Sequence, residues 1–407
     1  MTYQESIDWL YSTQLFGIKL GLENPKRVLK EYLAYPPHRT KVIHVAGTNG
    51  KGSTCAFIDS VARATGTRTG LFTSPHLVRY GERIRVSGAQ ISEDRIAQHL
   101  TALRLLVADW DPHPTFFELS LVLALKHFAE KSCELVVLET GMGGRLDATT
   151  AVPADVAVLT PIALDHQPWL GATLGEIAAE KAAIICPRKP TFSSQQEPAA
   201  RAIIEQTANE QRSPLEFVEP LLGYSLGITG DHQLENAGLA VAALHAAGIQ
   251  LEYESVKAGL ASTIWPGRFE RITAQFTNLN SEIILDIAHN PAAAHALAAT
   301  WRQTFRDRKA NLIFGAVDSK DIPGILEALL PIVAQLHLVP VNSPRATPPA
   351  DLLAHLPADH PPAETYHSVE DALKVPTMSP TLVTGSAFLV GEVKSLLEGS
   401  SQTPSAQ

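Results

Sequence analysis

The chain has 407 residues, 45% of them hydrophobic, and a formal net charge of −9 at pH 7. This length and apolar content favour two buried cores over one, and the acidic balance argues against a nucleic-acid-binding surface. The first residues are too polar for a signal peptide, and apolar runs such as 119–125 are far too short to span a bilayer. Cys55, Cys133 and Cys186 form neither a metal-binding spacing nor a disulfide framework. We therefore expect a cytoplasmic protein with reduced cysteines and neither a membrane nor a nucleic acid as partner.

A glycine-rich segment lies between a strand-like run at 42–46 and a helix-like run after Ser53. It consists of Gly47, Thr48, Asn49, Gly50, Lys51, Gly52 and Ser53. In such a turn, backbone N–H groups converge on an anion, the helix N-terminus adds partial positive charge, and a lysine adds a point charge. The segment differs from the common G-x-x-x-x-G-K-[ST] loop, because Val45 replaces its first glycine and Gly52 follows Lys51. We expect these residues to bind phosphates; the simpler alternative is a tight turn with a surface lysine.

Three further strand-like runs lead to polar residues: one ends before Ser74, one at Glu139, and one before His166. Because the carboxyl ends of parallel strands share one edge of a sheet, these side chains could hold a cation beside the phosphates. Magnesium prefers oxygen ligands, so a histidine in the set would also admit manganese. The alternatives are a helix cap or ion-pair partner for Glu139 and an ordinary loop histidine for His166.

Strand-like and helix-like runs alternate along the chain, which predicts parallel sheets with helices on both faces. Early strands are expected at 42–46, 134–139 and 155–160, with helices near 92–108, 117–130, 173–184 and 231–246; a second series has strands at 282–286, 311–316, 334–339 and 381–384. The break between the two series contains Pro266 and Gly267. We predict an α/β protein with a P-loop, mostly parallel domain over 1–264, a smaller Rossmann-like α/β domain over 265–398, and a disordered tail over 399–407.

Nine segments, in order, resemble the folylpolyglutamate synthase/dihydrofolate synthase family, the folate branch of the Mur ligases. They are GTNGKGS, TSPHLVRYGERIRVSG, ETGMGGRLDATT, ALDH, EIAAEKAAII, GDHQLENA, WPGRFE, DIAHNP and VTGSAFLVGEV. The chain departs from the family pattern at Thr150 and Ile287. Its stretch between 217 and 231 is short, which predicts a trimmed hairpin there. The resemblance implies an ATP-dependent carboxylate–amine ligase with an ATP-binding domain and a glutamate-ligase domain.

The resemblance also implies roles for individual residues. Magnesium would be held by Ser74, Glu139, His166 and Lys181, the last as a carbamate. ATP would be bound by the glycine-rich segment together with Asn236, Arg268 and Asp286. Substrates would be contacted by Arg83, Phe117, Arg145, Asp147, His289 and Ser386, and the catalytic set would be Lys51, Lys181, Arg268 and His289. Without the resemblance, Lys181 is interpreted as a helix-surface lysine paired with Glu176 or Glu180.

The implied reaction transfers the γ-phosphoryl group of ATP to a substrate carboxylate, and the amine of L-glutamate then displaces phosphate. The expected substrates are dihydropteroate and the polyglutamate tails of folates, and the expected enzyme is a monomer using Mg²⁺ or Mn²⁺. Three alternatives stay open: tail extension alone, a Mur-type ligase acting on a cell-wall UDP-sugar peptide, and a non-enzymatic ATP-dependent binding module.

Overall fold

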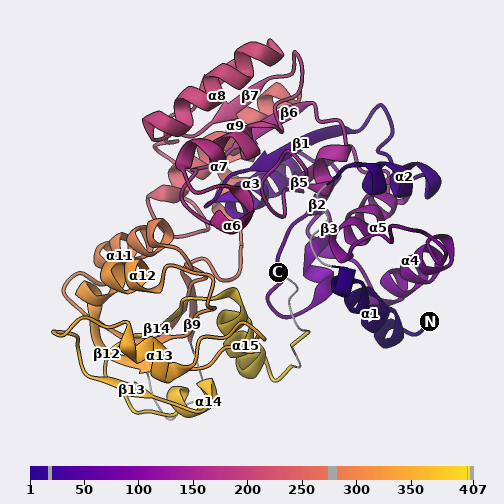
Figure 1. The fold of residues 1–407 in the computed structure, drawn as a ribbon. Helices are drawn as coiled ribbons and strands as arrows, with labels where there is room; N and C mark the ends of the chain where they lie inside the picture. Colours follow the sequence, from indigo (N-terminus) through magenta and orange to yellow (C-terminus); the bar gives the residue numbers. More distant parts are fainter. Residues whose placement is uncertain (17–20, 274–281, 401, 404–407) are drawn as a thin grey trace.

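The computed structural model describes residues 1–16, 21–273, 282–400 and 402–403, and their strands form two sheets (Figure 1). Sheet A has the strand order β4-β3-β2-β5-β1-β6-β7-β8, and sheet B has the order β13-β12-β11-β14-β10-β9. Neighbouring strands run parallel, except that β3 is antiparallel to β2 and β4, and β9 is antiparallel to β10. The mostly parallel α/β fold expected from the sequence is therefore confirmed.

The elements of the sheet A region alternate as the sequence pattern predicts. Its strands are β1 Lys41–Ala46, β2 Thr69–Phe72, β3 Ile84–Val86, β4 Ala89–Gln90, β5 Leu135–Glu139, β6 Val156–Leu159, β7 Thr191–Ser193 and β8 Leu215–Phe217. Its α-helices are α1 Tyr3–Ser12, α2 Glu23–Glu31, α3 Lys51–Ala64, α4 Glu93–Leu106, α5 Phe116–Glu130, α6 Gln167–Leu170, α7 Leu174–Ala182, α8 Pro198–Gln211, α9 His232–Ala246 and α10 Tyr253–Ala261. Its 3₁₀ turns are η1 Thr13–Phe16, η2 Tyr80–Arg83 and η3 Ala148–Ala151.

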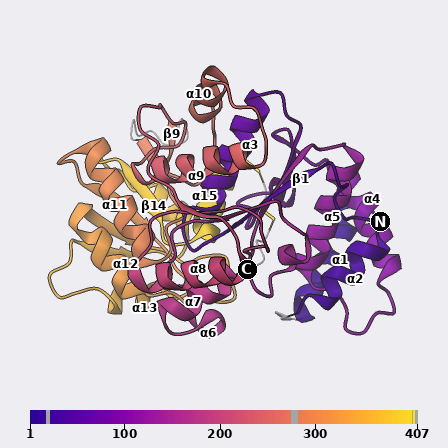
Figure 2. The same cartoon turned by 90° about the horizontal axis from the view of Figure 1, so that it is seen from above.

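Strand β1 shows how sheet A is covered on both faces. Ile43 and Val45 join the core formed with α3, α9 and α10. Val42 points to the opposite face, into the core of α1, α2, α4 and α5, and Ala46 joins the core of α7 and α8. Figure 2 shows α3, α9 and α10 on one side of this sheet and α6, α7 and α8 on the other. A strand covered on both faces is mostly apolar, which explains the residue types at 42–46. The one polar residue of this run, His44, is buried, and its Nε2 lies 2.7 Å from Thr149 Oγ1.

Sheet B is covered by helices in the same way. Its strands are β9 Glu270–Thr273, β10 Glu282–Leu285, β11 Ala310–Phe314, β12 Val333–Leu338, β13 Ala363–Thr365 and β14 Thr381–Thr384. Its helices are α11 Pro291–Phe305, α12 Ile322–Leu329, η4 Leu330–Ile332, α13 Pro349–Ala354, α14 Val369–Leu373 and α15 Ala387–Glu398. Ile284 packs against α11 and α12, whereas Ile283 and Leu285 pack against α14 and α15. No helix among the described residues has the length and apolar character needed to cross a membrane.

Two expectations at the end of the chain and after β8 compare with the structure as follows. In the predicted tail, Gln402 Nε2 donates to Leu77 O at 3.0 Å and Thr403 N donates to Val78 O at 2.7 Å, while disorder of 399–407 stays a prediction. Residues 401 and 404–407 of the predicted tail lie outside the described residues. The stretch 218–231 contains no strand, so β8 is followed by a loop and not by a trimmed hairpin.

Candidate functional site

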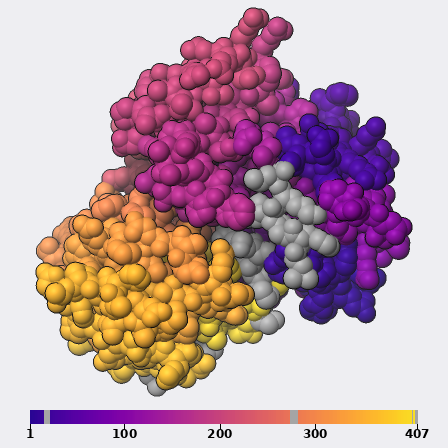
Figure 3. All heavy atoms as spheres, viewed as in Figure 1, coloured from indigo at the N-terminus to yellow at the C-terminus, as the bar shows by residue number. Residues whose placement is uncertain are grey.

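The carboxyl edges of the two sheets meet around one pocket of about 500 Å³. In the space-filling view, the orange part of the sheet B region lies directly against the magenta part of the sheet A region (Figure 3). The pocket brings together many of the residues expected from the sequence. They are Gly47, Thr48, Asn49, Gly50, Lys51, Gly52, Ser53, Ser74, Glu139, His166, Lys181, Asn236, Arg268, Asp286, His289 and Ser386. Open α/β sheets bind ligands at this edge.

The glycine-rich loop joins β1 to α3, which begins at Lys51. Gly50 has φ 86°, and a Cβ atom there would lie 2.4 Å from Asn236 Oδ1. A Cβ at Gly47, which has φ 149°, would lie 1.9 Å from Thr160 Oγ1. Both positions therefore require glycine. Lys51 Nζ donates to the carbonyls of Gly47 and Thr48, each at 3.1 Å. The ammonium group therefore lies against the loop that is expected to bind phosphates.

The expected cation ligands lie beside this loop. Glu139, the last residue of β5, is buried and accepts from Ser74 N at 3.0 Å. Burial raises the pKa of Glu139, and the charge of Lys51 opposes the rise. His166 has φ 52° and precedes α6. The buried hydroxyls of Ser53 and Thr140 have no hydrogen-bond partner among the described atoms. This oxygen-rich donor set with one imidazole fits a divalent cation bound beside phosphates.

The structure places Lys181 inside the pocket, not on the helix surface. Only 4% of the residue is exposed, and Nζ donates to Gly47 O at 2.8 Å. Burial, aided by the nearby charge of Lys51, lowers the pKa of Lys181 to about 7. Glu180 pairs with Arg145, and Glu176 caps α7 through Thr173. The surface-pair alternative is therefore wrong for this lysine.

Two more expected residues fix the backbone around the pocket. Asn236, on α9, lies over Gly50, accepts from Thr54 Oγ1 at 3.2 Å and donates to Gln233 Oε1 at 2.9 Å. Asp286, directly after β10, accepts from the backbone N–H groups of Phe269 and Ala288, each at 2.9 Å. Burial raises the pKa of Asp286, whereas the Arg268 guanidinium lowers it. Asp286 thus sets the backbone next to Arg268 as well as the loop that carries His289.

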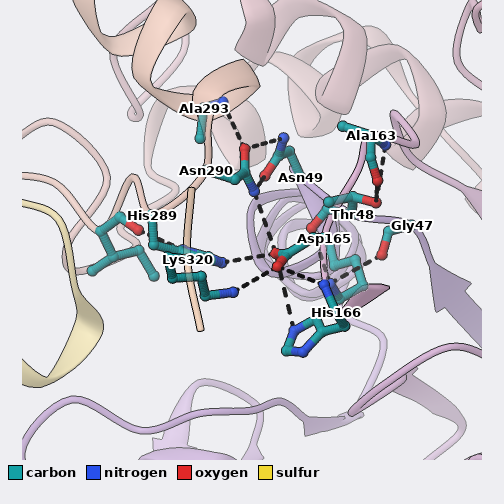
Figure 4. A network of polar contacts seen from close by, with 12 residues as sticks. Gly47, Thr48, Asn49, Ala163, Asp165, His166, His289, Asn290, Ala293 and Lys320 are labelled. Carbon is teal, nitrogen blue, oxygen red and sulfur yellow. Dashed lines mark hydrogen bonds and ion pairs between the residues drawn. The ribbon is translucent and has the colours of Figure 1, made fainter. Parts of the chain in front are cut away.

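Asp165 is the most connected carboxylate of the site, and the sequence reasoning gave it no role (Figure 4). It binds Lys320 Nζ at 2.6 Å, His289 Nε2 at 3.3 Å and Asn290 Nδ2 at 3.4 Å, all from the sheet B region. Burial by itself raises the pKa of Asp165, but the hydrogen bond from His289 and the charges of His289 and Lys320 outweigh it. The pKa therefore lies below its usual range.

Other contacts reinforce this junction between the two sheets. Asn49 and Asn290 exchange side-chain hydrogen bonds of 3.2 and 2.9 Å. His289 Nδ1 lies 2.8 Å from Ile287 O, and donation to that carbonyl directs Nε2 towards Asp165. Asp165 lies in the quoted ALDH segment and Asn290 in DIAHNP, so both had a sequence signal. Lys320 lies in none of the nine motifs and had no such signal.

Four expected substrate residues do not line the described pocket. Arg83 is 2% exposed and donates through Nε to His76 Nδ1 at 2.8 Å. The Phe117 ring lies over Gly141, where a Cβ would approach it to 2.8 Å. Asp147 accepts from the N–H groups of Gly141 and Met142, each at 2.9 Å, so it shapes the glycine turn after β5.

Arg145 projects from the same turn, with 57% of its side chain exposed, and pairs with Glu180 at 2.7 Å. Nearby, Thr150 Oγ1 donates to Gly144 O at 2.6 Å, which closes the loop at one departure from the family pattern. At the other, buried Ile287 donates through its backbone N–H to Gly267 O at 3.0 Å. Ser386 differs from these residues, since it lines the pocket while its hydroxyl caps α15 by accepting from Phe388 N at 3.1 Å.

Comparison with known proteins gives two family matches. Residues 45–190 match the Mur ligase middle domain, and residues 267–385 match the Mur ligase, glutamate ligase domain. The chain is 36% identical over 355 residues to the dihydrofolate synthase/folylpolyglutamate synthase of Escherichia coli K12, covering 83% of this chain and 82% of that protein.

Solved structures give the same result. The structure of E. coli FolC in complex with DHPP and ADP is similar with a TM-score of 0.86 and 32% identity, covering 97% of this chain and 98% of that one. The bifunctional folylpolyglutamate synthase/dihydrofolate synthase from Yersinia pestis, complexed with AMPPNP and Mn ion, gives a TM-score of 0.85 at 32% identity, with 98% of both chains covered.

Proposed function

Because this chain belongs to the folylpolyglutamate synthase/dihydrofolate synthase family of Mur-type ligases, we propose that it catalyses both reactions of the family's name. It is an ATP-dependent ligase that adds L-glutamate to folates and uses a divalent metal. The proposal assigns it dihydropteroate and folate polyglutamate tails as substrates. Its main support is the single pocket in which the glycine-rich loop, the cation ligands and His289 of the other sheet lie together.

In the first step, a carboxylate oxygen of the pterin substrate bonds to the γ-phosphorus of ATP. The bond from that phosphorus to the β–γ bridging oxygen breaks, so an acyl phosphate forms and ADP leaves. Lys51 and Arg268 line the pocket and would neutralise the charge of the transferring group. Ser74, Glu139 and His166 would hold the divalent metal, which supplies further charge neutralisation at the phosphates when bound.

In the second step, the glutamate amine attacks the acyl carbon, a C–N bond forms, and inorganic phosphate leaves while the nitrogen loses a proton. We assign the glutamate subsite to the sheet B side, where His289 and Ser386 line the pocket. The contacts of Asp165 with His289 and Lys320 join the two sides of this subsite. Such a junction limits access of water, which would otherwise hydrolyse the acyl phosphate.

The proposal includes a carbamate on Lys181. The neutral amine attacks CO₂, forms a C–N bond and loses one proton, which turns a cationic side chain into an anionic oxygen ligand of the kind that magnesium prefers. Only about one free lysine side chain in a thousand is neutral at pH 7.4. Burial lowers the pKa of Lys181 to about 7, so a far larger fraction of this amine is neutral at that pH. The amine also lies against the loop expected to hold phosphates, through its 2.8 Å bond to Gly47 O.

We further propose that 1–264 and 265–398 act as two domains, since each has a buried core of its own, and that the enzyme is a monomer. The cytoplasmic location expected from the sequence stays a prediction.

Mass spectrometry of reaction products tests the dual activity. Purified protein is given ATP, L-glutamate, a magnesium salt and either dihydropteroate or tetrahydrofolate. We expect dihydrofolate from the first substrate and a glutamate-extended product from the second, each with stoichiometric ADP. Extension of tetrahydrofolate without any dihydrofolate would leave tail extension as the only activity. Absence of both products from an ATP-binding protein would contradict the proposal.

A further inference from the structure

Helices α4 and α5 bring together three potential metal ligands far from the pocket. His99 lies on α4, and His127 and Glu130 lie on α5, with one ligand atom from each within 4.8 Å of the other two. Figures 1 and 2 both place these helices on the side of sheet A that faces away from sheet B. We propose that His99, His127 and Glu130 form a second metal site, which takes a transition-metal ion such as Zn²⁺.

Each of the two histidines has one ring nitrogen without a hydrogen-bond partner among the described atoms. His99 is 3% exposed and His127 is 4% exposed. His99 Nε2 and His127 Nδ1 are buried and have no hydrogen-bond partner among the described atoms. His99 Nε2 lies 3.4 Å from Glu130 Oε2, but without the geometry of a hydrogen bond. Buried polar atoms are almost always paired, so two adjacent exceptions point to a ligand that pairs them.

Tyr32 favours the tautomer of His99 that can bind a metal through Nε2. Its hydroxyl lies 3.1 Å from His99 Nδ1 and 3.4 Å from the His99 carbonyl oxygen. When the hydroxyl donates to the carbonyl, its oxygen accepts from Nδ1–H, and the lone pair of the imidazole then lies on Nε2. Outer partners of this kind orient metal-binding histidines. An imidazole binds a metal through its unprotonated nitrogen, so this arrangement leaves Nε2 of His99 able to act as a ligand.

The geometry of the cluster suits a tetrahedral ion. Zinc bonds of about 2.0–2.2 Å place neighbouring tetrahedral ligand atoms about 3.4 Å apart. The distance from His99 Nε2 to Glu130 Oε2 already has this value, and a ligand atom of His127 lies within 4.8 Å of the other two ligand atoms. Two protein nitrogens and one carboxylate leave a fourth position for water. Glu130, with 34% of its side chain exposed, gives that position a route to solvent.

The surrounding charges select the type of metal. Arg95 Nη2 binds Glu130 Oε2, the oxygen that lies near His99, and Arg95 Nη1 donates to Gln98 Oε1. Arg95 can serve as the outer partner of this carboxylate when the metal binds through a remaining lone pair of Oε2 or through Oε1. Its positive charge, together with those of Lys126 and Lys131 nearby, opposes any added cation. Magnesium or calcium would have one carboxylate here, which is too few oxygen ligands. A metal that prefers imidazole nitrogen can offset this repulsion.

Zinc counting tests the proposal in the whole protein. Wild type is treated with a chelator, supplied with excess Mg²⁺ and a modest excess of Zn²⁺, and passed through gel filtration before elemental mass spectrometry. His127→Gln and Glu130→Gln remove one ligand each, and His245→Gln removes an exposed histidine on α9 as the matched control. We expect both site variants to retain one zinc per chain fewer than wild type and the control. Zinc bound at the pocket does not affect this difference in zinc count, because all four proteins have the same pocket.

Cobalt provides a second measurement with the same four proteins. Tetrahedral Co²⁺ absorbs strongly in the visible range, so the signal reports coordination and not mere adsorption. We expect the site variants to lose the absorption that wild type and His245→Gln show. Equal zinc counts in all four proteins, or equal cobalt spectra, would overturn the proposal. Glu130→Gln changes a partly exposed residue, so it keeps the test valid if His127→Gln fails to fold.

Discussion

On the sheet A side of the pocket, most polar groups directly follow a strand or begin a helix. Residues 47–50 join β1 to α3, which begins at Lys51, and Glu139 is the last residue of β5. On the sheet B side, His289, Asn290 and Lys320 instead converge on Asp165, which belongs to the opposite side. The first side is set by local chain geometry, and the second depends on contacts between residues more than a hundred positions apart.

This difference suggests separate roles for the two sides. Local geometry at strand ends gives the rigidity that phosphate transfer needs, because the charges must be in place before the reaction. Contacts across a junction can form and break as substrates enter and products leave. Substitutions on the sheet A side should therefore lower kcat strongly, because phosphoryl transfer is impaired. Substitutions in the junction should instead lower kcat/KM for glutamate. The following predictions test this contrast, from the largest expected effect to the smallest.

Lys51→Ala removes the cation that begins α3 and should lower kcat for either substrate roughly a thousandfold. The fold should persist, because Nζ contacts only the loop carbonyls of Gly47 and Thr48 among the described residues. Steady-state ADP release measures the effect, and circular dichroism checks the fold. Lys257→Ala, on the exposed surface of α10, is the control and should stay near wild type. Near-normal turnover of Lys51→Ala would contradict the assignment of the glycine-rich segment as the phosphate-binding loop.

Lys181→Ala should lower kcat roughly a hundredfold, because the carbamate and its metal contact are lost. Added short carboxylates should restore part of this activity, and the same carboxylates should leave Lys51→Ala inactive. Since the pKa of Lys181 is about 7, the neutral amine is the minor form below that pH. Stimulation of chelator-treated wild type by bicarbonate should therefore grow as pH rises through 7. Full activity with an unmodified Lys181 in intact-protein mass spectra would contradict the carbamate.

Lys320→Met breaks one contact of the junction and should lower kcat/KM for glutamate about tenfold, equivalent to about 1.4 kcal/mol. The loss is limited because Asp165 keeps its contacts with His289 and Asn290. KM for ATP should change little. Lys189→Met, which breaks a more exposed lysine–aspartate pair with Asp155 at 3.0 Å in the sheet A region, is the control. An equal loss of kcat/KM for glutamate in both variants, or an effect only on KM for ATP, would contradict the role in glutamate use that we assign to the junction.

Arg145→Ala should have the smallest effect, a severalfold rise in KM for dihydropteroate with little change for tetrahydrofolate. The reason is its exposure: the side chain lies outside the pocket lining and its pair with Glu180 is a surface ion pair, which contributes little to stability. Arg201→Ala removes a comparable surface pair with Glu205 on α8 and serves as the control. Unchanged dihydropteroate kinetics would exclude Arg145 from substrate binding.

Much of the fold was predictable from the sequence. The strands expected at 42–46, 134–139 and 155–160 correspond to β1, β5 and β6, and helices near 92–108, 117–130, 173–184 and 231–246 correspond to α4, α5, α7 and α9. The short strands β3, β4, β7, β8 and β13, of two or three residues each, were missed because so few residues give no clear period. Strand β9 was also missed, and α8 and α10 were passed over although they are amphipathic.

The sequence by itself determined the glycine-rich loop and the position of Glu139 at a strand end, because both depend on residues adjacent in the chain. Only the tertiary structure decided the burial of Lys181, the exposure of Arg145 and the role of Asp165. The same holds for the approach of His99 to His127, which requires α4 and α5 to pack together. Burial and ion pairing depend on which distant segments come into contact, and no local spacing of residue types encodes that.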